Sequence, residues 1–144
     1  MAEEYVHRYT GAEIDEAVGK ALPTVDYIVE QGEVTTTGSL ACNWYYEKYA
    51  SGRFVAYMSG TLSSSTSNSG KSATVALPFR VPSTYYNVQL SPTTNSNLLV
   101  NMGVRNSAGS GSGKTTEQFT VYSTLSAATT DSVGVDIVVR GRWM

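Results

Sequence analysis

The spacing of hydrophobic and polar residues changes once along this chain, close to Pro23. Before Pro23, residues 11–22 place apolar side chains at steps of three and four, which is typical of an amphipathic helix. Thr10 and Glu13 have the spacing of a capping box, and Pro23 ends the run. The sequence therefore predicts one short helix over residues 11–22, within an N-terminal oligomerisation segment of residues 1–24.

Ile14, Val18 and Ala21 form the apolar seam of this predicted helix. A helix of about three turns is marginal in water unless its apolar face is buried. The seam is therefore expected to pack either against the rest of the chain or against copies of itself, and the sequence does not choose between the two. We treat the three residues as candidates for an oligomer interface.

After Pro23 the spacing becomes that of β-strands. Residues 24–34 and 42–62 alternate in steps of two, and Ser51-Gly52 has the composition of a hairpin turn between two aromatic-rich strands. Residues 63–72 are rich in Ser, Asn and Gly without periodicity, which predicts a flexible loop. Between residues 73 and 144, five further strand-like runs alternate with turn residues. We expect a hairpin region at 25–62 that packs with a head at 73–144 as one domain.

The fold class follows from the short connections between these strands. They leave no room for crossover helices, so the strands should pair antiparallel. The prediction is a mainly β fold in which a short N-terminal helix precedes an antiparallel, jelly-roll-like β-sandwich. In the last strand, one face carries Val133, Val135, Ile137 and Val139. This strand should be buried, and its truncation should unfold the domain.

Composition narrows the classes of partner. Charged residues make up 15% of the chain and the net charge is −2, so the basic excess that nucleic acid or an anionic membrane surface attracts is missing. No apolar run reaches the length of a membrane span. One Cys and one His exclude an intrachain disulfide and a Cys/His zinc site, and we expect no metal or cofactor. The start lacks the apolar stretch of a signal peptide, so we expect synthesis in a cytoplasm.

Residues Ala108–Thr115 look like a nucleotide-binding P-loop. A P-loop requires a helix directly after the glycine turn, because the helix N-terminus holds the phosphates. Here the next residues alternate, with Phe119 and Val121 on one face and Thr120 and Tyr122 on the other, as in a strand. We therefore expect no nucleotide and interpret the glycines as a hairpin loop with Lys114 as a solvated charge.

Catalysis finds little support in the sequence. His7 has no evident orienting partner for a nucleophilic mechanism. The isolated acids Glu47, Glu117, Asp131 and Asp136 keep glycoside cleavage open as an alternative, since nothing fixes their separation. We predict a protein without catalytic residues.

Aromatic residues are better candidates than these acids for contacts with a ligand or a neighbouring subunit. In residues 43–49, alternation places one set of rings inside and leaves a second set for a neighbouring strand, a subunit or a ligand. The two sets are Trp44, Tyr46 and Lys48, and Tyr45, Glu47 and Tyr49. Tyr85 and Tyr86 lie at a predicted junction between a loop and a strand, where rings can remain exposed. The candidate ligand-binding residues are Tyr85, Tyr86, Asn87, Asn106 and Lys114.

Five stretches together resemble the tail-fibre or receptor-binding proteins of tailed bacteriophages, particularly their small C-terminal head domains. They are "YTGAEIDEAVGKAL", "NWYYEKYASGRFVAYMSGTL", "LPFRVPSTYYNV", "FTVYSTL" and "VDIVVRGRW". The resemblance implies a homotrimer joined by N-terminal helices, whose heads bind a bacterial surface polysaccharide or protein. It also implies other tail proteins as partners and a place in the virion tail, after synthesis in the bacterial cytoplasm. The alternatives are a structural virion component without receptor binding and a glycan depolymerase.

Overall fold

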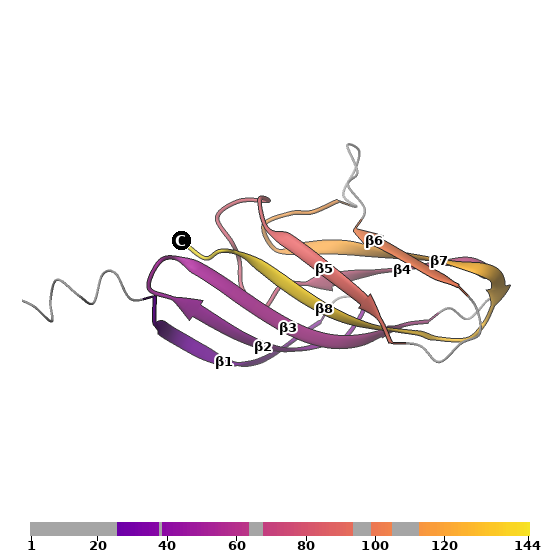
Figure 1. Ribbon diagram of the computed structural model, residues 1–144, viewed down its shortest axis with the longest axis horizontal. Helices are drawn as coiled ribbons and strands as arrows, with labels where there is room; N and C mark the ends of the chain where they lie inside the picture. The colour runs from indigo at the N-terminus through magenta and orange to yellow at the C-terminus, as the bar shows by residue number, and fades with distance from the viewer. Residues whose placement is uncertain (1–25, 38, 64–67, 94–98, 105–112) are drawn as a thin grey trace, which may run out of the picture.

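Antiparallel strands form two facing sheets in the computed structural model, which describes residues 26–37, 39–63, 68–93, 99–104 and 113–144 (Figure 1). The larger sheet has the order β1-β2-β3-β8-β5, with β1 Ile28–Thr36, β2 Cys42–Tyr49, β3 Arg53–Leu62, β8 Val133–Arg142 and β5 Asn87–Pro92. The smaller sheet has the order β4-β7-β6, with β4 Asn68–Ala76, β7 Gln118–Thr129 and β6 Val100–Val104. The predicted mainly β, antiparallel fold is confirmed.

The described residues contain no helix, and therefore none that is long and apolar enough to cross a membrane. The helix predicted over residues 11–22, with its seam of Ile14, Val18 and Ala21, lies outside the described residues, as does His7.

The path of the chain joins the two halves of the sequence in one sheet. Strands β1, β2 and β3 follow one another as a meander, and the chain then alternates between the sheets through β4, β5 and β6. On its return, β7 pairs between β4 and β6, and β8 pairs between β3 and β5. The hairpin region of residues 25–62 and the last strand therefore share a continuous hydrogen-bonded sheet.

The turn between β2 and β3 contains Ser51-Gly52, as predicted. Gly52 has a φ of 87°, which favours glycine, and its N–H donates to the carbonyl of Tyr49 at 2.9 Å. The carbonyl of Gly52 accepts from the N–H of Trp143 at 2.8 Å. The turn fixes the register of β2 on β3 and also ties the C-terminal residues to it.

The loop predicted over residues 63–72 is wrong in its second half, because β4 already begins at Asn68. Lys71 takes an inward position on this strand that apolar residues usually take. Its side chain is only 2% exposed, and its Nζ donates to the carbonyl of Thr129 at 2.9 Å. A lysine at a core position conceals the alternation by which strands are recognised.

Ser123 lies opposite Lys71 on β7 and is also fully buried. Its Oγ has no hydrogen-bond partner among the described residues. We predict that Ser123→Ala leaves the free energy of unfolding unchanged or raises it by up to about 1 kcal/mol, because the change removes a desolvated hydroxyl that nothing compensates. Urea denaturation measures this.

Ser126→Ala is the matched control for that change. Ser126 lies on the same strand, and its Oγ accepts from the N–H of Leu99 at 3.1 Å, so its removal should lower stability slightly. A fall of more than about 1 kcal/mol for Ser123→Ala would show that the hydroxyl has a partner after all.

The core lies between the sheets and uses the residues expected from the alternation. Val133, Val135, Ile137 and Val139 of β8 are all buried, as predicted. Trp44 of β2 is buried too, and its Nε1 donates to the carbonyl of Ala76 at 2.9 Å and to Oγ1 of Thr36 at 3.1 Å. Because Trp44 points inward, its neighbours Asn43 and Tyr45 point out from the large sheet.

Candidate functional site

One row of outward-facing side chains crosses all five strands of the large sheet. The pairing registers align one residue from each strand, in the order Glu33, Tyr45, Tyr57, Val138 and Gln89. Residues that are directly opposite on antiparallel strands project from the same face. We call this set the tyrosine row; it has two aromatic rings and a valine at its centre and polar groups at both ends.

The two tyrosines of this row form an exposed aromatic surface. The ring centroids of Tyr45 and Tyr57 are 6.2 Å apart, with 27° between the ring planes. The residues are 37% and 40% exposed. Rings in this arrangement present flat apolar area with polar hydroxyl ends, which suits contacts with an amphipathic ligand.

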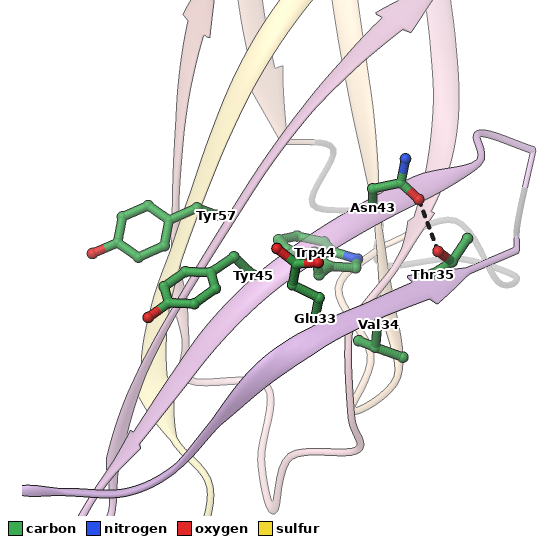
Figure 2. Close-up of a pocket in the computed structure, with 7 residues that line it drawn as sticks. All are labelled: Glu33, Val34, Thr35, Asn43, Trp44, Tyr45 and Tyr57. Atoms are coloured by element: carbon green, nitrogen blue, oxygen red, sulfur yellow. Dashed lines mark hydrogen bonds between the residues drawn. The ribbon is translucent and has the colours of Figure 1, made fainter.

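An open groove of about 500 Å³ runs beside these rings (Figure 2). Tyr45 and Tyr57 stand side by side at one end, and Asn43 and Thr35 lie at the other, with the Glu33 carboxylate between them and close to Tyr45 (Figure 2). Thr35 Oγ1 donates to Asn43 Oδ1 at 2.8 Å, so the amide nitrogen of Asn43 keeps its donors for a ligand. Val34 and Trp44 complete the lining, although their side chains pack toward the core.

A second carboxylate holds the tyrosines in place. Glu47 accepts from the hydroxyl of Tyr45 at 3.0 Å through one oxygen and from the hydroxyl of Tyr49 through the other. These hydrogen bonds are the main reason why the pKa values of Tyr45 and Tyr49 are raised; partial burial and the charge of Glu47 add to the effect. The charge of Glu33 also raises the pKa of Tyr45, by a smaller amount.

The structure separates the two tyrosines that the sequence placed at a loop junction. Tyr85 is 92% exposed. Tyr86 is only 4% exposed, and its hydroxyl donates to the carbonyls of Thr115 at 2.9 Å and Gln118 at 3.0 Å. Burial raises the pKa of Tyr86 to about 12. The expectation that Tyr86 offers its ring to a ligand is therefore wrong, because its hydrogen bonds lock it into the core.

The other candidates from the sequence lie apart from the tyrosine pair. Lys114 donates through Nζ to the carbonyl of Tyr86 at 2.6 Å and lies 4.7 Å from the centroid of the Tyr86 ring, so it is not the free loop charge that was expected. Asn87 is exposed at the start of β5, and Asn106 lies outside the described residues. Whether Tyr85, Asn87 and Lys114 contact a ligand stays a prediction.

The strand expected after the P-loop lookalike is confirmed. Residues 108–112 of the motif lie outside the described residues, but β7 begins at Gln118, where a P-loop would require a helix. The hydroxyl of Thr115 accepts from the N–H of Gln118 at 3.1 Å, within the turn that starts the strand.

The four candidate acids do not gather at one place. Glu117 precedes β7 and pairs with Arg80 at 3.5 Å, whereas Asp131 follows the other end of that strand. Glu47 and Asp136 both face outward on the large sheet, from β2 and β8, and Asp136 accepts from the hydroxyl of Ser59. The described residues contain no group of three His, Cys, Asp or Glu side chains suited to a metal.

Sequence reasoning missed Tyr57 and Glu33. The alternation through β3 was the signal for an outward Tyr57, but its partner depends on the register. A two-residue turn at Ser51-Gly52 would place Tyr57 opposite Tyr46, whereas the observed pairing is centred on Ser51 and places it opposite Tyr45. Glu33 could not be found in this way. Its place beside Tyr45 depends on the β1–β2 register, which includes an irregularity between Ile28 and Glu30.

Fold and site together define an all-β sandwich with an exposed aromatic groove on its larger sheet. No family model matches the chain, and no curated protein matches it by sequence. Among solved structures, the chain is similar to an N-truncated R2-type pyocin tail fiber, with a TM-score of 0.51 and 11% sequence identity. The match covers 99% of this chain and 55% of the tail fiber chain. At this identity the likeness shows the fold alone.

Proposed function

We propose that this chain is a tail-fibre protein of a phage or phage-tail-like particle that attaches to a bacterial surface receptor without catalysis. The observation that carries the proposal is the exposed Tyr45–Tyr57 pair above a groove lined by hydroxyl, amide and carboxylate groups. The fold likeness to a tail fiber supports the same conclusion over nearly the whole chain. The receptor class that suits stacked rings and hydrogen-bonding rims is a surface polysaccharide.

The proposal extends to the oligomeric state of the protein and to its location in the virion. The alternation of β3–β6 between sheets, with β7 and β8 returning between them, supports a jelly-roll-like winding. We propose a homotrimer whose subunits are joined through their N-terminal segments. It associates with other tail proteins in the virion and is made in the bacterial cytoplasm. Three weak sites on one assembly would bind a repetitive surface through avidity.

Glu47, one of the outward-facing acids, is already bound by side chains of the protein. Both oxygens of Glu47 accept from tyrosine hydroxyls, which leaves this carboxylate poorly placed to transfer a proton to a sugar. Glycan cleavage would appear as new reducing ends that are lost when Glu47 or Asp136 is changed to the amide. We expect no release of reducing ends.

Adsorption to cells tests the attachment function. Fluorescently labelled full-length protein is mixed with cells to which the parent particle adsorbs, and the bound fraction is measured with and without competing particles. We expect saturable binding that the particles displace. Incorporation into particles without any binding to such cells would instead support a structural component.

Deletion of residues 1–24 tests the assembly. We predict that the intact chain has the mass of a trimer in light scattering coupled to size exclusion, and that the shortened chain has the mass of a monomer. The pair Ile14→Asp and Val18→Asp should have the same effect, because a charge in the seam must lose its hydration when the helices associate. A monomeric intact chain, or a trimer that survives both changes, would contradict helix-driven assembly.

A further inference from the structure

We propose that the tyrosine row binds a glycan that carries protonated amino groups, with an ammonium group held between the Glu33 carboxylate and the Tyr45 ring. The inference rests on the proposed attachment function and adds the charge of the receptor and the contacts that select it.

The outward face of the large sheet carries an unpaired carboxylate beside the tyrosines. Glu33 is exposed and has no ion-pair partner among the described residues. The arginines of the same face already meet acceptors of the protein. Arg53 pairs with Asp26. Arg140 keeps its positive charge, because it donates to the neutral amide of Gln89 at 3.0 Å, at the end of the row away from Glu33. The carboxylate that remains free beside the Tyr45 ring is that of Glu33, and it attracts a cationic group to this end of the row.

The opposite face of the same strands shows how this fold holds an ammonium group. The Nζ of Lys48 lies 3.1 Å from Glu30, and its distances to the ring centroids of Phe79, Trp143 and Tyr46 are 4.4, 5.3 and 5.6 Å. Glu30 on β1 also accepts from the hydroxyl of Tyr46 on β2 at 2.8 Å. One carboxylate from β1 and aromatic rings surround a single amine there.

Glu33 and Tyr45 repeat that combination on the outer face without a lysine. They are directly paired across β1 and β2, and Tyr57 adds a second ring. Among the described residues no cation of the protein occupies this place. An ammonium group of a ligand would gain both the ion pair and the cation–π contact that Lys48 makes inside.

The dimensions of the row favour a chain of sugars over a single sugar. Four gaps between neighbouring strands separate Glu33 from Gln89, which gives roughly 19 Å at about 4.8 Å a gap. A linear oligomer lying across the strands would place an amine at Glu33, one ring over the tyrosines and further hydroxyls towards Val138 and Gln89.

Three oligosaccharides of equal length test the inference with the full-length protein. They are a β-1,4-linked glucosamine oligomer at a pH where its amines are protonated, its N-acetylated counterpart and an oligogalacturonate. By calorimetry we expect the free amine to bind roughly five- to tenfold more tightly than the N-acetylated chain, with an advantage that shrinks at high salt. The oligogalacturonate should bind least.

Glu33→Gln should abolish the preference for the free-amine oligomer over the N-acetylated one. It should leave the affinity for the N-acetylated oligomer unchanged. Glu117→Gln is the matched control, because it removes the same charge from an exposed position outside the groove and should preserve the preference. Equal affinity of the free and acetylated oligomers, equal effects of the two variants, or full displacement by oligolysine would each overturn the inference. Wild-type adsorption to cells, measured alongside, distinguishes these failures from a failure of the attachment function itself.

Discussion

A chain that ends at residue 132 is expected to remain unfolded, as judged by circular dichroism and by the loss of a cooperative urea transition. Strand β8 lies between β3 and β5 in the large sheet, so its removal leaves both of them without their shared partner. The deletion also removes the four buried aliphatic side chains Val133, Val135, Ile137 and Val139. Each contributes about 1.5–3 kcal/mol, so their sum is comparable to the whole stability of a domain, about 5–15 kcal/mol.

Two smaller changes near the C-terminus should have correspondingly smaller effects on the free energy of unfolding. Ile137→Ala should lower the free energy of unfolding by about 2–5 kcal/mol, since it leaves a cavity between the sheets. Removal of Met144 alone should change stability little, because its side chain is largely exposed. A soluble chain of residues 1–132 with a cooperative transition would show that the sandwich does not depend on β8.

The double variant Tyr45→Ala and Tyr57→Ala is expected to lose adsorption to cells. An aromatic anchor at the centre of a binding site contributes about 2 kcal/mol or more, so each ring should account for roughly a thirtyfold change in affinity. In a trimer the loss would be larger, because avidity multiplies the affinity of each site. Flow cytometry of labelled protein on receptor-bearing cells measures the effect.

Controls for this variant come from the other exposed tyrosines. Tyr122→Ala removes a ring of similar exposure from the smaller sheet and should leave adsorption unchanged. Tyr45→Phe keeps the ring and should retain most of the binding. Tyr85→Ala decides whether the loop tyrosine that the sequence indicated also contacts the receptor. Normal adsorption by the double variant, with an unaltered urea midpoint, would place the receptor site elsewhere on the protein.

Local patterns in the sequence were enough to predict much of the sheet structure. The alternation through residues 42–62 and the turn at Ser51-Gly52 predicted β2, β3 and their hairpin, because a glycine at positive φ and a period of two are properties of adjacent residues. The aliphatic face of β8 predicted its burial for the same reason. The alternation after Lys114 predicted a strand where a P-loop requires a helix, and β7 is that strand.

Tertiary structure decided what depends on distant residues. Lys71 is in a strand because β4 pairs with β7, and its buried amine is satisfied by the carbonyl of Thr129, far along the chain. In the same way, Thr115 and Gln118 accept from the hydroxyl of the buried Tyr86. The tyrosine row draws its members from five strands, whose order and register follow from packing of the two sheets. The sequence by itself determined which residues alternate and where the chain turns, since those are local preferences of the backbone. Only the folded sheet decided that Glu33, Tyr45 and Tyr57 lie side by side, because pairing between strands is set by the burial of their opposite faces.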